Sequence, residues 1–202
     1  MRLLYSPTSP YVRKVMASAI HLGLADRIIC VAGHPSPVKP DPAVSDVNPL
    51  GKVPAATLDD GTVLLGSRTI CEWLAATGAD PAFLPAGGAP RWAVLELHDL
   101  ADGILDAALL ARYESAVRPE ALRWADWHSG QLGKIDAALS RLNALADRLA
   151  GPVTLGSITT GCALGYLDFR FADHSWRAAN PRLAAWWAEF GETAPMAQTR
   201  PA

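Results

Sequence analysis

The chain has 202 residues, 50% of them hydrophobic, and a formal net charge of −2 at pH 7. This length can bury a sizeable core, as one large domain or two small ones. The absence of a basic run argues against nucleic-acid binding, and no apolar stretch is long enough to span a bilayer. Pro7 and Pro10 interrupt the apolar run after Met1-Arg2, which is not typical of a signal peptide. We therefore expect a cytoplasmic protein that binds neither nucleic acid nor membrane.

Three cysteines, Cys30, Cys71 and Cys162, lie far apart in the chain. Their number is odd, and they form neither a CxxC pair nor a cluster with histidines. A disulfide framework or a zinc site is therefore not expected. We predict free thiols and no bound metal.

The first third of the chain alternates strand and helix patterns. Strands are predicted over 2–5, 28–31, 52–58 and 62–65, and helices begin at Ser9-Pro10 and at Gly66-Ser67. A serine followed by proline is typical of a helix start, and the turn Asp59-Asp60-Gly61 joins the last two strands as a hairpin. A loop with four prolines lies between the second and third strands. This order predicts a small layered α/β fold.

The composition changes over residues 77–90, which contain three glycines and three prolines and which we interpret as a linker. Only helical patterns follow it. The expected helices cover 91–114, a leucine-rich stripe over 132–149, the apolar segment 154–171 and a last helix that begins at Asn180-Pro181. The sequence thus predicts a first domain over 1–77, a linker over 78–89 and an all-helical domain over 90–202.

The helix start at Ser9 could stabilise a thiolate. Free N–H groups and a partial positive charge lie at a helix N-terminus, and a serine hydroxyl can donate a hydrogen bond to sulfur. Both effects lower the pKa of a thiol from about 8.5 toward neutrality. The alternative is that Ser9 only caps the helix.

Two further sites could hold a peptide-like ligand. Val53-Pro54 is a candidate cis bond at a strand start, where the backbone of Val53 could pair with an added strand. The hydroxyl of Ser67 and the N–H groups of the helix that begins there could hold a carboxylate. An ordinary turn proline and a simple helix cap are the alternatives.

In this order and spacing, the motifs resemble the glutathione transferase superfamily. The matching stretches are SPTSPYVRKV at 6–15, NPLGKVPA at 48–55, GSRTICEWL at 66–74 and LGYLDFRF at 164–171. The resemblance covers essentially the whole chain. It implies a thioredoxin-like domain that binds glutathione, an all-helical domain with a pocket for a small apolar electrophile, and a homodimer.

The resemblance also implies roles for single residues in thiol activation and in contacts with the cysteinyl unit. Ser9 stands where omega-like members carry cysteine, and Thr8 or Tyr5 are alternative activating hydroxyls. Val53 matches the residue whose backbone pairs with the cysteinyl unit, and Pro54 matches the cis-proline.

Further residues are assigned to the binding of glutathione. Ser67 matches the residue that binds the γ-glutamyl carboxylate. Lys39, or with less support His34, would meet the glycyl carboxylate. Lys52 and Gly66 complete the set of expected glutathione-binding residues.

Two positions depart from the family pattern. Gly66 stands where a carboxylate usually pairs with the γ-glutamyl ammonium, and its loss would weaken binding by about 1–3 kcal/mol. An aspartate of the other subunit could compensate, the candidates being Asp99, Asp102 and Asp106. In the helical domain, Ser157 replaces the aspartate of a capping box that begins at Thr154, so reciprocal capping is expected to be weaker but not lost.

The function expected from these residues is conjugation of glutathione, as a thiolate, to an apolar electrophile. A non-enzymatic binding protein, or a glutathione-dependent isomerase, dehalogenase or etherase, are the alternatives. Arg13 and Arg170 are expected to be structural ion partners. The aromatic side chains of the helical domain are expected mainly in the core: Trp92, Tyr113, Trp124, Trp127 and Tyr166.

Overall fold

A computed structural model describes residues 1–201, which form two compact units. The first unit contains residues 1–86 together with the described residues from Ala194 on, and the second unit contains Gly87–Thr193. The expected fold class, an α/β part followed by an all-helical part, is confirmed. Within residues 1–201, no helix is long and apolar enough to cross a membrane.

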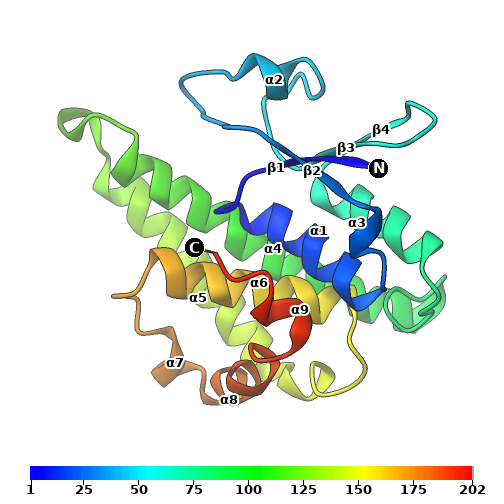
Figure 1. Cartoon of the computed structure of the whole chain (residues 1–202). Helices are drawn as coiled ribbons and strands as arrows, with labels where there is room; N and C mark the ends of the chain where they lie inside the picture. The colour runs from blue at the N-terminus through cyan, green and yellow to red at the C-terminus, as the bar shows by residue number, and fades with distance from the viewer. Residues whose placement is uncertain (202) are drawn as a thin grey trace. The chain divides into compact units, whose positions relative to one another are not determined.

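The first unit is built on a four-stranded sheet with the strand order β2-β1-β3-β4 (Figure 1). Its strands are β1 (Arg2–Tyr5), β2 (Ile29–Ala32), β3 (Ala55–Thr57) and β4 (Val63–Leu65). Strand β2 runs parallel to β1, whereas β3 is antiparallel to both β1 and β4. Its helices are α1 (Pro10–His21), α2 (Pro42–Ser45), α3 (Ser67–Thr77) and α9 (Ala194–Ala197), with a 3-10 turn at Ala25–Arg27.

Helices α1 and α3 lie side by side on one face of this sheet (Figure 1). Val12 and Val15 of α1 and Ile70, Cys71 and Leu74 of α3 are all at most 1% exposed. Their spacing of three and four residues puts them on one face of each helix. Burying these side chains against the sheet is the main contribution that holds the two helices in place.

The third strand is shorter than its predicted span of 52–58. The carbonyl oxygen of Lys52 accepts a hydrogen bond from the side chain of Asn48 at 2.8 Å, and Pro54 has no N–H to donate. Backbone pairing in the sheet therefore starts only at Ala55.

The second unit is a helical bundle around α6. Its long helices are α4 (Gly88–Ala116), α5 (Ala125–Ala144), α6 (Leu155–Arg170) and α8 (Pro181–Phe190), with shorter turns at Glu120–Leu122, Ala146–Arg148 and Trp176–Ala179 (α7). Every residue of α6 from Leu155 to Leu167 is buried. A Cβ atom at Gly156 would lie 2.8 Å from the carbonyl oxygen of Val94 and from Cβ of Leu97, so glycine is needed where α6 and α4 approach.

Hydrogen bonds fix both ends of α6. At its start, Thr154 and Ser157 complete a reciprocal capping box, as expected for a serine in the aspartate position. Near its end, the Asp168 carboxylate accepts from the two terminal nitrogens of the Arg177 guanidinium at 2.8 and 2.7 Å and from the indole N–H groups of Trp176 and Trp187 at 3.1 and 2.9 Å. Asp168 therefore ties α7 and α8 to α6.

Three expectations for these helices are wrong. Trp92, Trp124 and Trp127 are 65%, 63% and 41% exposed instead of lying in the core. The leucine-rich helix ends at Ala144, before the last two leucines of its stripe. The helix that begins at Pro181 is not the last, because α9 follows it.

The two arginines expected to form ion pairs have other surroundings. Arg13 is 8% exposed and donates to the carbonyl oxygen of Met196 and to the hydroxyl of Thr199, at 3.0 and 3.3 Å. These neutral acceptors hold the segment 196–199 against α1. Within residues 1–201, Arg170 has no carboxylate partner.

Candidate functional site

The strand register brings the predicted site residues to one edge of the sheet. Tyr5 at the end of β1 is paired with Ala32 at the end of β2. Since Leu3 pairs with Ala56 in the antiparallel pair β1–β3, the continued register places Pro54 opposite Tyr5. The N–H of Gly66 then donates to the carbonyl oxygen of Pro54 at 3.2 Å. The segments that carry Ser9, Val53 and Ser67 therefore all leave the sheet at this edge.

Ser9 is the N-cap residue of α1. Its side-chain oxygen accepts a hydrogen bond from the N–H of Val12 at 3.3 Å, which confirms that it caps the helix. A serine hydroxyl has one proton to donate in addition to two acceptor positions, so capping leaves the O–H free to donate elsewhere. The side chain is half-buried. Ser9 can therefore cap α1 and donate to a ligand at the same time.

The backbone of Val53 is held in place by the loop before it. The Val53–Pro54 bond is cis, as predicted. Among the described residues, neither the N–H nor the C=O of Val53 has a hydrogen-bond partner, although the residue is only 9% exposed. Asn48, which is 2% exposed, donates to the carbonyl oxygen of Lys52 and accepts from the N–H of Leu50 at 3.0 Å. Asn48 was part of a matched motif, but its role in shaping this loop was not predicted.

Gly66 and Ser67 form the junction between β4 and α3. Gly66 is the N-cap residue with φ +82° and ψ 149°, a conformation that residues with side chains rarely adopt. Ser67 is 6% exposed, and its hydroxyl makes no hydrogen bond within residues 1–201. The alternative that Ser67 merely caps α3 is therefore wrong. A hydroxyl without a protein partner beside a helix N-terminus is suited to an anionic acceptor.

The candidate cations lie on the loops before and after α2. Lys39 and Lys52 are exposed, and the N–H of Lys39 donates to the hydroxyl of Ser36 at 3.1 Å. The backbone N–H of His34 donates to the Asp41 carboxylate at 2.8 Å and lowers its pKa. Hydrogen bonds thus fix the backbone of the loop before α2, and the side chains of both lysines are in solvent.

The remaining candidates are divided between the two units. Thr8 and Tyr5 are half-buried on the segment that leads into α1. Asp99, Asp102 and Asp106 lie on α4 in the second unit. The ring of His98, 1% exposed, pairs with Asp99 at 2.9 Å and with Asp102 at 3.3 Å.

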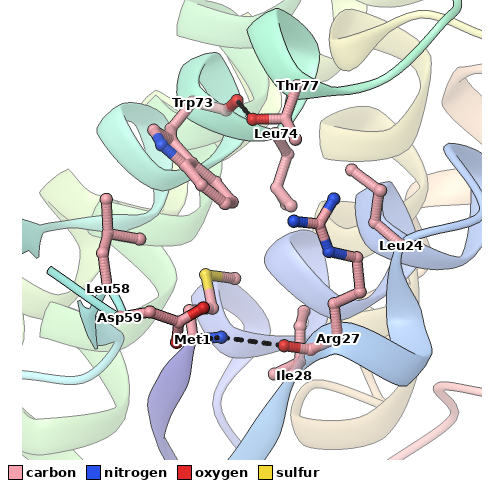
Figure 2. A pocket seen from close by; sticks show the side chains of 9 residues that line it. All are labelled: Met1, Leu24, Arg27, Ile28, Leu58, Asp59, Trp73, Leu74 and Thr77. Carbon is pink, nitrogen blue, oxygen red and sulfur yellow. Dashed lines mark hydrogen bonds and ion pairs between the residues drawn. The ribbon is translucent and has the colours of Figure 1, made fainter.

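A cavity of about 50 Å³ lies at the opposite end of β1 from Ser9 (Figure 2). The guanidinium of Arg27 and the indole of Trp73 both point into it, above Met1. None of the predicted site residues lines it. Its complete lining is Met1, Leu24, Arg27, Ile28, Leu58, Asp59, Trp73, Leu74 and Thr77.

Comparison with known families agrees with this arrangement. Residues 8–77 match the model of the glutathione S-transferase N-terminal domain, and residues 125–188 match that of the C-terminal domain. The chain is 33% identical over 204 residues to the "Uncharacterized GST-like protein YibF" of Escherichia coli K12, covering 100% of this chain and 98% of that protein. The chain therefore belongs to the glutathione S-transferase family.

Solved structures are similar over the whole chain. A glutathione transferase family member from Pseudomonas fluorescens Pf-5, crystallised with bound glutathione, has a TM-score of 0.97 and 44% identity, covering 100% of this chain and 98% of that one. A second crystal structure from the same organism contains S-(propanoic acid)-glutathione, with a TM-score of 0.92, 42% identity and 100% coverage of both chains.

Proposed function

We propose that this protein is a glutathione transferase, in which the first unit binds glutathione and lowers the pKa of its thiol. The second unit holds a small electrophile. The observation that supports this most is the pair of unsatisfied groups at one sheet edge, the backbone of Val53 and the hydroxyl of Ser67, beside the helix start at Ser9. The relatives crystallised with glutathione or with an S-substituted glutathione support the same ligand.

Each group has a proposed role in holding the tripeptide. The N–H and C=O of Val53 pair with the cysteinyl backbone like an added strand, next to Pro54. The hydroxyl of Ser67 and the N-terminus of α3 bind the γ-glutamyl carboxylate, with Gly66 allowing the sharp turn. Lys39 neutralises the glycyl carboxylate, and Lys52 lies on the loop that leads to Val53.

Thiol activation is assigned to the start of α1. The free O–H of Ser9 donates to the sulfur, and the positive end of the helix stabilises the thiolate. The thiolate then forms an S–C bond with the electrophile. When the electrophile is an activated alkene, the reaction is an addition: the π electrons move to the neighbouring carbon, which takes a proton from water. In substitution, the leaving group departs with the electron pair.

Isothermal titration with glutathione tests the binding site. Replacing Ser67 by alanine removes the proposed hydrogen bond to a carboxylate and should weaken binding by about tenfold or more, since hydrogen bonds to charged groups contribute about 1.5–3 kcal/mol. Thr69→Ala, which removes an exposed hydroxyl from the same helix, is the matched control. Equal affinities for both variants, or no binding to the unmodified protein at millimolar glutathione, would contradict the proposal.

A non-enzymatic glutathione-binding protein is the second candidate, and Gly66 is the observation that favours it. Conjugation assays with acrylate, for addition, and with an activated aryl chloride, for substitution, separate the two. Turnover above the uncatalysed rate supports the transferase. Glutathione binding without any acceleration of either reaction supports the binding protein, or one of the specialised isomerase, dehalogenase or etherase reactions.

The homodimer and the cytoplasmic location also remain proposals. An aspartate from the partner subunit would supply the charge that Gly66 lacks. The candidates Asp99, Asp102 and Asp106 all lie on α4, and Asp106 serves as the test position. Sedimentation velocity should give twice the monomer mass, and Asp106→Asn should weaken glutathione binding if this aspartate contributes. Unchanged affinity would remove Asp106 from the site.

A further inference from the structure

Two arginines of the second unit lie close together without a carboxylate partner. Arg112 lies near the end of α4 and Arg170 is the last residue of α6. Helices α4 and α6 pack against each other, and burial, followed by the nearby charge of Arg112, lowers the pKa of Arg170. Both side chains are half-buried, and within residues 1–201 neither forms a salt bridge. Two like charges held near each other repel, and an anion bound between them would offset that repulsion.

Part of the Arg170 side chain is left with an unsatisfied donor. Its Nε atom is buried and has no hydrogen-bond partner within residues 1–201. The guanidinium carbon lies 3.9 Å from the centre of the Phe169 ring, so one face of the group is covered. A buried donor without an acceptor is costly, and each such group in a folded protein calls for an explanation, of which a bound water or anion is one.

Two tyrosines complete the surroundings of this pair. Tyr166 on α6 is 4% exposed, Tyr113 on α4 is half-buried, and neither hydroxyl has a hydrogen-bond partner among the described residues. Burial raises the pKa of both phenols, and the charge of Arg112 acts on both in the opposite direction. Both hydroxyls are therefore protonated donors at neutral pH. The rings of Tyr166 and Phe171 pack with their centres 6.5 Å apart.

A structural role at the helix ends explains only part of this arrangement. A cation near a helix C-terminus interacts favourably with the helix dipole, which accounts for one arginine on each of α4 and α6. It does not explain why the two charges lie together, or why Arg170 Nε and the two hydroxyls are left without acceptors. The shared feature of all four side chains is that each offers a donor and none offers a negative charge.

We propose that Arg112, Arg170, Tyr113 and Tyr166 form a binding site for an anionic group carried on a small, partly apolar molecule. A planar carboxylate fits the guanidinium fork best, because two parallel N–H groups can donate to its two oxygens. The aromatic rings of Phe169 and Phe171 suit an apolar body next to that group. This proposal rests on the proposed function in one respect: it specifies that the electrophile taken by the second unit bears an acid group.

Binding of a matched acid and amide tests the site without glutathione. Titration of the whole protein with 3-phenylpropanoate and with the neutral 3-phenylpropanamide should show the acid binding about tenfold or more tightly, as expected for a charge-assisted bidentate contact. Arg112→Gln, Arg170→Gln and Tyr166→Phe should each reduce this preference. Arg123→Gln removes the same charge from an exposed position of the same unit and should leave it unchanged. Unfolding curves check that each variant is folded. If Arg170→Gln is unfolded, Arg170→Lys takes its place, because lysine keeps the charge but lacks the two parallel N–H groups of the guanidinium.

The outcomes separate this proposal from the proposed function. Equal binding of acid and amide, or a loss of preference in Arg123→Gln as large as in Arg112→Gln, overturns the anion site even if the protein binds glutathione normally. Preferential binding of the acid without any binding of glutathione supports the anion site and overturns the transferase. If both hold, the enzyme should accelerate glutathione addition to acrylate over its uncatalysed rate more than addition to acrylamide. The Arg112→Gln variant should lose that difference while its affinity for glutathione stays unchanged.

Discussion

The amide N–H of Gly66 donates a hydrogen bond of 3.2 Å to the carbonyl oxygen of Pro54, and this contact joins the end of β4 to the start of β3. Because Val53 precedes Pro54 and Ser67 follows Gly66, the same contact places the two unsatisfied groups of the proposed glutathione site on neighbouring segments. Any change that alters the backbone at Gly66 should therefore affect both stability and ligand binding.

Substitution of Gly66 should destabilise the protein whatever side chain is introduced. Its φ of +82° with ψ of 149° is nearly restricted to glycine, whereas a Cβ atom there would meet no other atom within 4 Å. The cost is therefore conformational strain, about 1–3 kcal/mol. Urea unfolding of Gly66→Ala and Gly66→Asp should give similar losses.

The aspartate variant also tests the missing charge. Compared with Gly66→Ala, which carries the same strain, Gly66→Asp should bind glutathione more tightly because its carboxylate can pair with the γ-glutamyl ammonium. Equal affinities in the two variants would mean that another group already satisfies that ammonium.

Replacement of Ser9 by alanine should have two separable effects. Loss of the cap to the Val12 N–H should lower the unfolding free energy by about 1 kcal/mol. Loss of the donor should raise the pKa of the bound glutathione thiol, measured by its thiolate absorbance in the ultraviolet. Thr8→Ala is the comparison variant. A raised thiol pKa in Thr8→Ala but not in Ser9→Ala would assign activation to Thr8 and leave Ser9 as a cap alone.

Asn48 is predicted to control the loop that positions Val53. Asn48→Ala removes the hydrogen bonds to Lys52 and Leu50 and leaves the Lys52 carbonyl without its donor and the Leu50 N–H without its acceptor. We expect a loss of about 1–3 kcal/mol in unfolding free energy and weaker glutathione binding. Asn48→Asp keeps the acceptor but not the donor. It should therefore also lower the unfolding free energy and weaken glutathione binding. A destabilised variant with unchanged affinity would show that the loop does not position the ligand.

Asp168 should make stability depend on pH in the acid range. Burial alone would raise its pKa, but hydrogen bonds from Arg177, Trp187 and Trp176 outweigh that effect and lower it. A carboxyl whose pKa is lower in the folded state stabilises the fold above its unfolded value of about 3.9, and this stability is lost as pH falls through the folded-state pKa.

Asp168→Asn is the variant that measures this contribution. It should be less stable than the unmodified protein at pH 7, and the difference should shrink when both are unfolded by urea below about pH 4. A difference that stays constant with pH would mean that the hydrogen-bond geometry, and not the charge, is what Asp168 provides.

Local patterns predicted much of the fold. Ser9-Pro10 specified the start of α1, and the hydrophobic spacing of Ile70, Cys71 and Leu74 specified the buried face of α3. The capping box at the start of α6 was predicted from Thr154 and Ser157 alone. These features depend on groups a few residues apart, so the sequence carries them directly.

Other features depended on partners distant in the chain. Among the residues that the structure describes, the hydroxyl of Ser67 has no hydrogen-bond partner, because Gly66, and not Ser67, is the N-cap of α3. The exposure of Trp92, Trp124 and Trp127 reflects which face of each helix the bundle left uncovered. Residues from Ala194 on pack with the first unit through Arg13, although no local pattern links them.

The sequence by itself determined the family, the strand and helix order and the residues that stand at the proposed glutathione site, because these follow from short motifs and hydrophobic periodicity. Only the tertiary structure decided which polar groups found partners. Among residues 1–201, Val53 and Ser67 were left without hydrogen-bond partners at one sheet edge, and Arg112 and Arg170 lie near each other without a carboxylate partner. Hydrogen-bond satisfaction is a property of three-dimensional neighbours, and a linear pattern does not specify those neighbours.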